Sequence, residues 1–364
     1  MPMGPFPGAT SELDLVRREY ESSVSWRVTR PLRALGRRAR AVTAQARRRP
    51  SDRPWSWSSS SRAQPGAYDS WLEHLHGERL GRIDAACKDA GEDAFALFRD
   101  LDDDLWALLL TQAYEAYPNI RSRLPSVPDP SLQRLWNGSS GAALASQSMA
   151  FYGKLRERFE QHSDRSLGDA RVLDFGCGWG RLTRFLARDV RPGSLYGCDP
   201  VEQILEVCRA SRVPATLART EFIPERLPFD EPFDLAFAFS VFTHLSEPAH
   251  EASLRALHAA LRPGAILVVT VRPPAYLRFC DRMHPVLESL GPDPRAKLEE
   301  PRYLFAAHDA DPGHPQYAGP EMAYGETVIT LPYVRQRWSP MFELLDVDLL
   351  IGDLYQVMLT LRRR

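Results

Sequence analysis

The chain has 364 residues, 44% of them hydrophobic, which is enough to bury one sizeable core and a second, smaller unit. The formal net charge is −1, yet residues 1–65 carry thirteen arginines against five acidic residues, so the remainder is acidic. No run approaches the roughly eighteen apolar residues of a membrane span, and the first residues lack the basic and apolar regions of a secretory signal. We therefore expect a cytoplasmic protein.

Residues 1–49 are predicted to form a basic amphipathic helical arm. Leu32, Leu35, Ala39 and Val42 recur on one face, with arginines mostly around the rest. Contact with an anionic membrane surface, docking onto a partner enzyme and a merely solvated arm all fit this pattern. Nucleic acid is not expected as a partner, because the acidic remainder would repel its backbone.

Residues 50–66 are rich in Ser and Pro and are predicted to be a flexible linker. A helical cap is predicted over 67–146, its clearest helix spanning Asp102 to Tyr117 and stopping at Pro118. The five cysteines show no C-x-x-C or zinc-ligand spacing. Neither disulfides nor structural zinc are therefore expected.

Residues 171–199 indicate a strand, a glycine-rich turn, a helix and a second strand. Gly176, Gly178 and Gly180 let the backbone turn tightly and approach a ligand. Asp199 ends the second strand, where an acidic side chain can accept both hydroxyls of a ribose. The pattern indicates a nucleotide cofactor.

Asp174, at the end of the first strand, narrows the choice of cofactor. A carboxylate there would repel a pyrophosphate but can hold the ammonium of an amino-acid group. Nicotinamide-binding folds place G-x-G-x-x-G directly after the strand instead. Glycine after a strand is also ordinary turn chemistry, and Asp at a strand end often only caps a helix, so this motif alone leaves both readings open.

Asp174-Phe-Gly-Cys-Gly-Trp-Gly180 resembles the first motif of class I S-adenosylmethionine-dependent methyltransferases. Residues 233–245 resemble their fourth strand with its following loop, and residues 261–271 resemble their fifth strand. The resemblance covers about residues 147–271. It implies S-adenosylmethionine as cofactor and an α/β fold with a doubly wound, Rossmann-like, seven-stranded sheet. That sheet is mostly parallel with a C-terminal antiparallel hairpin, and an N-terminal helical region is added to it.

The methyltransferase domain is predicted over 147–364, with an insertion at 275–326 that has no convincing period. This insertion and the helical cap are the expected seat of acceptor specificity. The hairpin is predicted from strands Phe342–Leu350 and Tyr355–Arg362. In related methyltransferases the helix before the first strand lies over the cofactor's methionine end. The loop Trp136–Gly141 is therefore a second-rank candidate site.

The candidate cofactor-binding residues are Asp174, Gly176, Cys177, Gly178, Gly180, Asp199, Pro200, Ser240 and Phe242. His244 follows the fourth strand, where open α/β sheets bind ligands, and is the candidate general base; a backbone bond that shapes its loop is the alternative. Weaker candidates for substrate contact are Glu202, Glu247, His284, Arg272, Tyr317 and Tyr324. No metal is expected, and no acid follows the third strand to bind adenine.

Residues 23–33 also resemble a segment of bacterial polysaccharide glycosyltransferases and their associated methyltransferases. We therefore expect O-methylation of a glycan or glycolipid precursor, in the cytoplasm or at the inner face of the membrane, with a glycosyltransferase as partner. Two alternatives stay open. One is a methyltransferase for a small metabolite or natural product, and the other is a non-catalytic, cofactor-binding scaffold of a polysaccharide complex.

Overall fold

The structure, a computed structural model, describes residues 68–364 except 92, 112–115, 310–316, 319–320 and 351–352. The predicted arm, 1–49, and linker, 50–66, lie outside the described residues. The chain divides into two compact units, 1–78 and 79–364. Helix α3 (Tyr68–Asp89) crosses that division, and everything that follows concerns the second unit. Among the described helices, none combines the length and the apolar character needed to cross a membrane.

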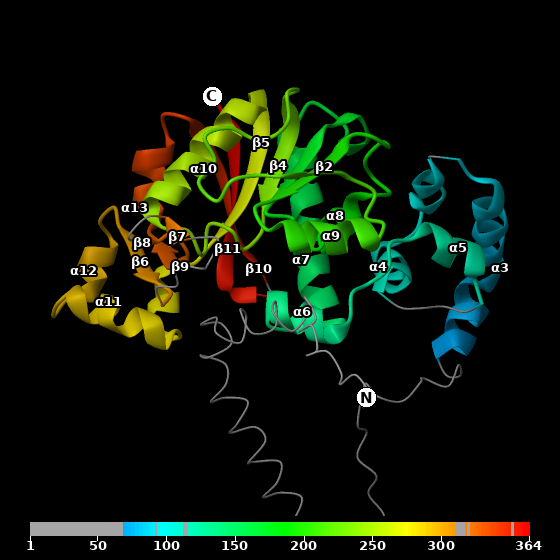
Figure 1. Cartoon of the computed structure of the whole chain (residues 1–364), viewed down its shortest axis with the longest axis horizontal. Coiled ribbons are helices and arrows are strands. Elements are labelled where there is room, and N and C mark those ends of the chain that lie inside the picture. The colour runs from blue at the N-terminus through cyan, green and yellow to red at the C-terminus, as the bar shows by residue number, and fades with distance from the viewer. Residues whose placement is uncertain (1–67, 92, 112–115, 310–316, 319–320, 351–352) are drawn as a thin grey trace, which may run out of the picture. The chain divides into compact units, whose positions relative to one another are not determined.

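Seven strands form the central sheet in the order β10-β11-β5-β4-β1-β2-β3 (Figure 1). Their bounds are Val172–Phe175 for β1, Leu195–Asp199 for β2, Thr216–Arg219 for β3, Phe233–Ala238 for β4, Leu261–Val271 for β5, Phe342–Leu350 for β10 and Asp353–Arg363 for β11. Strands β1 to β5 are parallel, whereas β11 is antiparallel to both β5 and β10. The predicted mostly parallel sheet with its C-terminal hairpin is confirmed.

Helices cover both faces of the sheet because side chains alternate along each strand. The helices are α7 (Ala142–His162), α8 (Thr183–Leu186), α9 (Glu202–Ala210), α10 (Glu247–Ala260) and α13 (Leu331–Tyr333), the last continued by a π-helical turn, Val334–Trp338. Phe237 contacts Phe151 of α7, with ring centroids 6.0 Å apart. Its neighbour Ala236 instead joins a buried core that includes Leu257 of α10. The parallel strands are therefore buried on both sides, as α/β sheets require.

Short helices precede the sheet: a 3-10 turn at Ala94–Phe98, α4 (Asp103–Thr111), α5 (Pro118–Arg123) and α6 (Pro130–Asn137). The helix predicted over Asp102–Tyr117 begins as expected, with the Asp102 carboxylate accepting from the N–H of Leu105 at 2.8 Å. Its described part ends at Thr111. Pro118 starts α5, which suits proline because the first helical N–H needs no partner.

The segment predicted as an insertion, 275–326, contains many short elements. They are two 3-10 turns (Pro274–Arg278 and Asp281–Met283), α11 (His284–Ser289), α12 (Pro294–Leu298), β6 (Tyr303–Ala307), β7 (Tyr317–Ala318) and β8 (Glu321–Met322), followed by β9 (Gly325–Ile329). β6 and β9 pair antiparallel over a small core of their own. None of the elements described in this segment is long enough to show a period in the sequence, which explains why the segment looked irregular.

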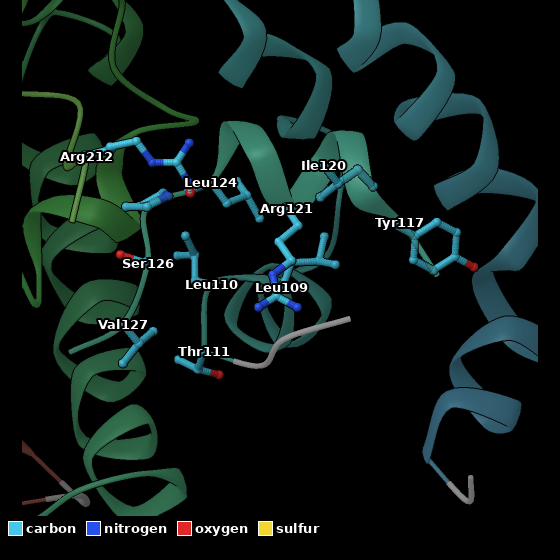
Figure 2. Close-up of a pocket in the computed structure, with 11 residues that line it drawn as sticks. Leu109, Leu110, Thr111, Tyr117, Ile120, Arg121, Leu124, Ser126, Val127 and Arg212 are labelled. Atoms are coloured by element: carbon cyan, nitrogen blue, oxygen red, sulfur yellow. Dashed lines mark hydrogen bonds between the residues drawn. The ribbon is translucent and has the colours of Figure 1, made fainter. Parts of the chain in front are cut away.

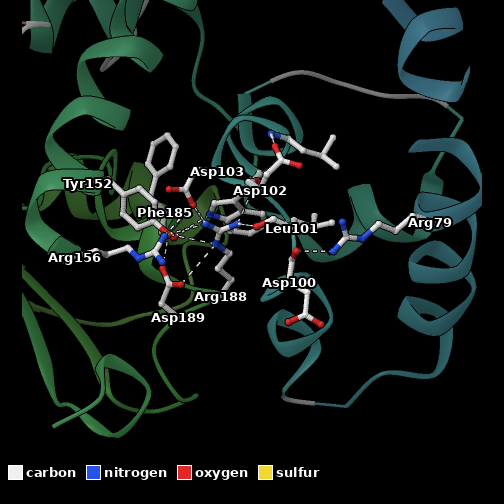
Figure 3. A network of polar contacts seen from close by, with 12 residues as sticks. Arg79, Asp100, Leu101, Asp102, Asp103, Tyr152, Arg156, Phe185, Arg188 and Asp189 are labelled. Carbon is white, nitrogen blue, oxygen red and sulfur yellow. Dashed lines mark hydrogen bonds and ion pairs between the residues drawn. The ribbon is translucent and has the colours of Figure 1, made fainter. Parts of the chain in front are cut away.

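A buried polar network fastens the short helices to α7 and to the end of α8 (Figure 3). Arg188 donates to the Leu101 carbonyl at 2.7 Å and forms an ion pair with Asp103. Tyr152 of α7 donates to Asp189 at 2.5 Å, and its oxygen accepts from Arg188 at 3.1 Å. Burial, together with the Asp189 charge, raises the pKa of Tyr152, which keeps the phenol protonated as a donor.

We expect Tyr152→Phe to lower the free energy of unfolding by about 1.5–3 kcal/mol, because it removes a buried donor to a carboxylate and an acceptor for a guanidinium. Arg191→Ala is the matched control: it breaks an exposed ion pair with Asp169 and should cost less than about 1 kcal/mol. Urea denaturation of the two variants measures both. Equal losses would show that the network does not fasten the helices.

Candidate functional site

The candidate site lies at the carboxyl ends of the central strands. Strand β1 pairs with β2 on one side and with β4 on the other, so the chain's strand order reverses at β1. Open parallel sheets bind ligands in the crevice at such a reversal. The residues that follow β1, β2 and β4 therefore meet at one edge.

The turn after β1 is shaped by glycines in the left-handed region, with φ of +77° at Gly176, +53° at Gly178 and +74° at Gly180. A Cβ at Gly176 would lie 2.4 Å from Val241, and one at Gly180 2.7 Å from Val213. A Cβ at Gly178 would meet nothing within 4 Å. The outer glycines are thus needed for packing, and Gly178 faces open space.

Asp199 holds this turn from the neighbouring strand. Its Oδ2 accepts from the N–H of Gly178 and its Oδ1 from that of Val201, both at 3.0 Å. Burial raises the pKa of this carboxyl to about 6, although the two hydrogen bonds by themselves lower it. Because a carboxylate offers about four lone-pair positions, two remain for a ligand.

Asp174 lies within β1 and is 2% exposed. It accepts from the Thr183 hydroxyl at 2.6 Å. Burial raises the pKa of its carboxyl to about 7, although the Thr183 bond and the Arg181 charge oppose this. The site therefore combines two buried acids whose charge is sensitive to pH near neutrality.

A polar network that the sequence did not reveal surrounds these acids. Arg181, whose pKa burial lowers to about 10, donates to Gln147 of α7 at 2.8 Å. Gln147 in turn donates to Asp353 at 2.9 Å, and Gln356 donates to the same carboxylate at 2.7 Å. These residues come from α7, the glycine turn and β11, which are far apart in the chain, so no local motif could indicate them.

The remaining candidate cofactor residues take different positions. Cys177 is buried, and a hydrogen bond to Cys208 together with burial raises the pKa of its thiol. Pro200 directly follows Asp199 at the end of β2.

Two further candidates lie in the loop after β4. Ser240 has a φ of +62°, and its N–H donates to the Thr270 hydroxyl at 2.7 Å. Phe242 is fully buried against His250 and Trp338, so its side chain supports the loop from within the core. A cofactor contact for each of these residues stays a prediction.

His244 is bonded through both ring nitrogens. Nδ1 lies 2.8 Å from the Gly325 carbonyl oxygen, an acceptor, so Nδ1 carries the proton. Nε2 then accepts from Arg272 at 3.2 Å. Burial, the Arg272 charge and His308 hold the pKa of His244 well below its usual range. The imidazole is therefore neutral, and Arg272 has to release Nε2 before it can accept another proton.

Strand β9 fixes the loop that carries His244. The Gly325 N–H donates to the His244 carbonyl at 2.7 Å, and the Thr327 N–H donates to the Thr243 carbonyl at 3.0 Å. Glu326, between them, is 3% exposed and forms an ion pair with Arg272. It also accepts from the Tyr276 hydroxyl at 3.0 Å and lies 3.3 Å from His308. Glu326, His308 and Tyr276 were missed by the sequence analysis.

The weaker candidates are divided between this cluster and other positions. Arg272 belongs to it, and Tyr324 stacks on the His244 ring at 4.8 Å. Glu202 pairs with Arg209 on α9, Glu247 accepts from Tyr333, and His284 is exposed at the start of α11. Tyr317 lies in β7, and its side chain is not among those described.

The loop Trp136–Gly141, the second-rank candidate, reaches the glycine turn: Trp179 donates to Asn137 at 2.8 Å. At the end of β3, Thr220 is buried, and its hydroxyl has no hydrogen-bond partner among the described residues. The Thr220 N–H donates to the carbonyl of Asp199 at 3.2 Å, which places the Thr220 backbone next to that of the candidate ribose-binding residue.

A separate hollow of about 220 Å³ lies among α4, α5 and Arg212 (Figure 2). Leucines and Ile120 line it, with Arg121 and Arg212 as its charged groups. None of the candidate cofactor residues is part of its lining. It is therefore distinct from the site at the strand ends.

The strand order, the antiparallel last strand and the acid-flanked glycine turn define a Rossmann-like fold of the class I methyltransferase type. Residues 172–264 match the family described as "Methyltransferase domain". That match begins at β1 and includes the glycine turn, Asp199 and His244. These residues of the chain are therefore similar in sequence to that family.

Named relatives match over a stretch of the chain of similar length. Trans-aconitate 2-methyltransferase of Variovorax paradoxus is 34% identical over 100 residues, which are 28% of this chain and 38% of that protein. Fatty-acid O-methyltransferase of Mycolicibacterium smegmatis is 32% identical over 119 residues, 32% of this chain and 43% of that protein. The chain thus spans about two fifths of the curated relatives it matches. A solved S-adenosylmethionine-dependent methyltransferase from Mesorhizobium loti is 20% identical, covers 59% of this chain and 98% of its own, and has a TM-score of 0.39.

Gly176→Ala should lower the free energy of unfolding by about 2–5 kcal/mol, because it adds a contact with Val241 to left-handed strain. Gly178→Ala adds only the strain, about 1–2 kcal/mol. Thermal and urea unfolding of the pair check this difference. If both alanines cost the same, the close approach of the turn to Val241 is wrong.

Proposed function

We propose that this chain is an S-adenosylmethionine-dependent methyltransferase that methylates an oxygen of its acceptor. The observation that carries the proposal is the methyltransferase-domain match over the segment in which Gly178 faces open space between Asp174 and Asp199. A scaffold that binds no cofactor would have no need for two buried carboxyls with raised pKa values at these strand ends.

The residues present fit this cofactor. Asp199 keeps two acceptor positions for the ribose hydroxyls, and the unpartnered Thr220 hydroxyl suits a further contact to the nucleoside. Asp174 provides a negative charge for the amino-acid ammonium, and Arg181 a positive charge for the carboxylate next to it. These assignments follow charge complementarity at one strand edge.

When bound, S-adenosylmethionine supplies a methyl group on a positively charged sulfur. The chain's contribution is to hold both reactants in line and to exclude water, which accounts for much of such catalysis. Helix α7 and the segment 136–141 close one side of the site, and the loop 240–246, fixed by β9, closes the other. The transfer calls for no metal ligand from the chain.

The acceptor we propose is a hydroxyl of a glycan or glycolipid precursor, on the resemblance of residues 23–33 to polysaccharide enzymes. A small carboxylic acid is the second candidate, and two observations favour it. The matched relatives are named for trans-aconitate and fatty acids. In addition, a carboxylate is already ionised and needs no base, which suits a neutral His244 held by Arg272.

The cofactor assignment is tested by calorimetry with two ligands, S-adenosylhomocysteine and 5′-methylthioadenosine, because the second lacks the amino-acid end. Asp199→Ala should weaken both by about 1.5–3 kcal/mol, since both carry the ribose. Asp174→Asn should weaken only S-adenosylhomocysteine. The control is Glu206→Gln, which removes an exposed acid from α9. Equal effects of Asp174→Asn on both ligands would contradict the ammonium assignment.

The same binding should depend on pH. Asp174 and Asp199, with pKa values of about 7 and about 6, take up protons as the pH falls, and only their charged forms attract an ammonium or accept two hydroxyls. The affinity for S-adenosylhomocysteine should therefore rise from pH 5 through pH 7 and level off only at about pH 8, where both carboxyls are ionised. A flat profile across this range would assign the binding to other groups.

If the acceptor is a hydroxyl and His244 its base, His244→Ala should slow single-turnover transfer by about 10²–10⁴-fold, and Asn should not restore it. Transfer is measured by mass spectrometry on surface glycan fractions, trans-aconitate and palmitate. His258→Ala, a half-buried histidine of α10, is the control. If His244→Ala transfers methyl to a carboxylic acid at the parental rate, His244 only shapes its loop, and a small carboxylic acid is the acceptor.

We also propose that the basic arm locates the enzyme on a partner glycosyltransferase or an anionic membrane, since a Ser/Pro linker separates it from every cofactor motif. Removing residues 1–65 should leave S-adenosylhomocysteine affinity unchanged and reduce co-sedimentation with anionic vesicles or retention by the glycosyltransferase. A folded truncation that no longer binds the nucleoside would refute this separation.

A further inference from the structure

Three potential metal ligands meet beside the loop after β4. His244 in that loop, His308 just after β6 and Glu326 in β9 have ligand atoms that all lie within 4.8 Å of one another. The pairing of β6 with β9 sets Ala306 opposite Glu326, and the His308 N–H donates to the Tyr324 carbonyl at 3.0 Å. The cluster is therefore built on paired backbone.

The His244 ring has the orienting second bond that is common in ligating histidines. The His244 Nδ1–H is bonded to the Gly325 carbonyl oxygen, which leaves the lone pair on Nε2. Ligating histidines generally use such a second bond to fix tautomer and orientation. The Tyr324 ring stacks on His244 at 4.8 Å and meets His308 edge-on at 5.0 Å, so both imidazoles are held by one aromatic side chain.

A positive charge already lies in this cluster. The Arg272 guanidinium forms an ion pair with Glu326 and donates to His244 Nε2 at 3.2 Å. It is held from outside by the Thr243 carbonyl at 3.1 Å and by the Tyr276 ring, 4.1 Å away. Because a buried carboxylate requires one compensating charge, a guanidinium and a divalent cation would compete for this position.

We propose that His244, His308 and Glu326 form a binding site for a zinc-class divalent ion, which the ion occupies in competition with Arg272. Two imidazoles and one carboxylate are a donor set used by zinc with an open fourth position, whereas magnesium and calcium prefer oxygen ligands alone. The bound ion joins the loop after β4 to the β6–β9 pair and occupies His244 Nε2. The metal ion thus controls whether His244 and its loop are available to the acceptor, whichever acceptor the protein uses.

The test uses the tag-free full chain, stripped of metal, titrated with Co²⁺ and followed by its visible absorption, and with Zn²⁺ by calorimetry. His308→Ala should weaken both ions by about 10- to 100-fold or more, while His284→Ala, which removes an exposed histidine, should change them less than about twofold. Arg272→Met should tighten Co²⁺ at least about tenfold by removing the competing charge. S-adenosylhomocysteine binding, measured on each variant, reports an intact fold independently of the metal.

The proposal fails if Co²⁺ binds the parent, His308→Ala and His284→Ala with the same affinity, because the ion then sits elsewhere. It also fails if Arg272→Met does not tighten binding while S-adenosylhomocysteine still binds. If Arg272→Met no longer binds S-adenosylhomocysteine, the test uses the parent protein and His308→Ala instead. Zn²⁺ must then raise the thermal unfolding midpoint of the parent but not that of His308→Ala, or the proposal fails. Loss of nucleoside binding in all proteins would instead count against the proposed methyltransferase function.

Discussion

The hydrogen bond from the Gly178 N–H to the Asp199 carboxylate is the contact on which the site depends. It joins the turn after β1 to the end of β2, while the N–H groups of Gly176 and Cys177 both donate to the Cys198 carbonyl at 2.8 and 3.0 Å. A side chain on the outer glycines would push Val241 or Val213 away and break this arrangement. The turn therefore holds Gly178 against Asp199, whose charge also acts on Asp174.

Keeping two acids buried there has an electrostatic cost that the surrounding chain offsets. The positive charge of the buried Arg181 stabilises the negative charge of Asp174. Arg181 also donates to Gln147, and both Gln147 and Gln356 donate to the Asp353 carboxylate. Burial still dominates, which is why the pKa of both candidate carboxyls stays raised. Such a site is ready for a cationic ligand, because the ligand supplies the charge that the protein lacks.

The additions to the central sheet converge on the same edge. The short helices reach the glycine turn through Arg184, which donates to the carbonyls of Gly180 at 3.0 Å and of Ser126 at 2.9 Å. From the other side, β9 pairs with the loop that carries His244. Changes in either addition therefore act directly on the glycine turn or on the loop that carries His244.

The mostly parallel sheet was implied by the resemblance to class I methyltransferases, whereas the residues alone determined the individual strands, the hairpin and the positions of Asp174, Asp199 and the three glycines. These are local properties: apolar runs set strands, and left-handed turns require glycine. Only the tertiary structure decided what surrounds them. Arg181 meets Asp353 through Gln147, and His244 meets Arg272, Glu326 and His308, because a parallel sheet brings distant strand ends together without any spacing rule in the chain. For the same reason the basicity of His244 could not be read from its motif, since burial and the Arg272 charge determine it.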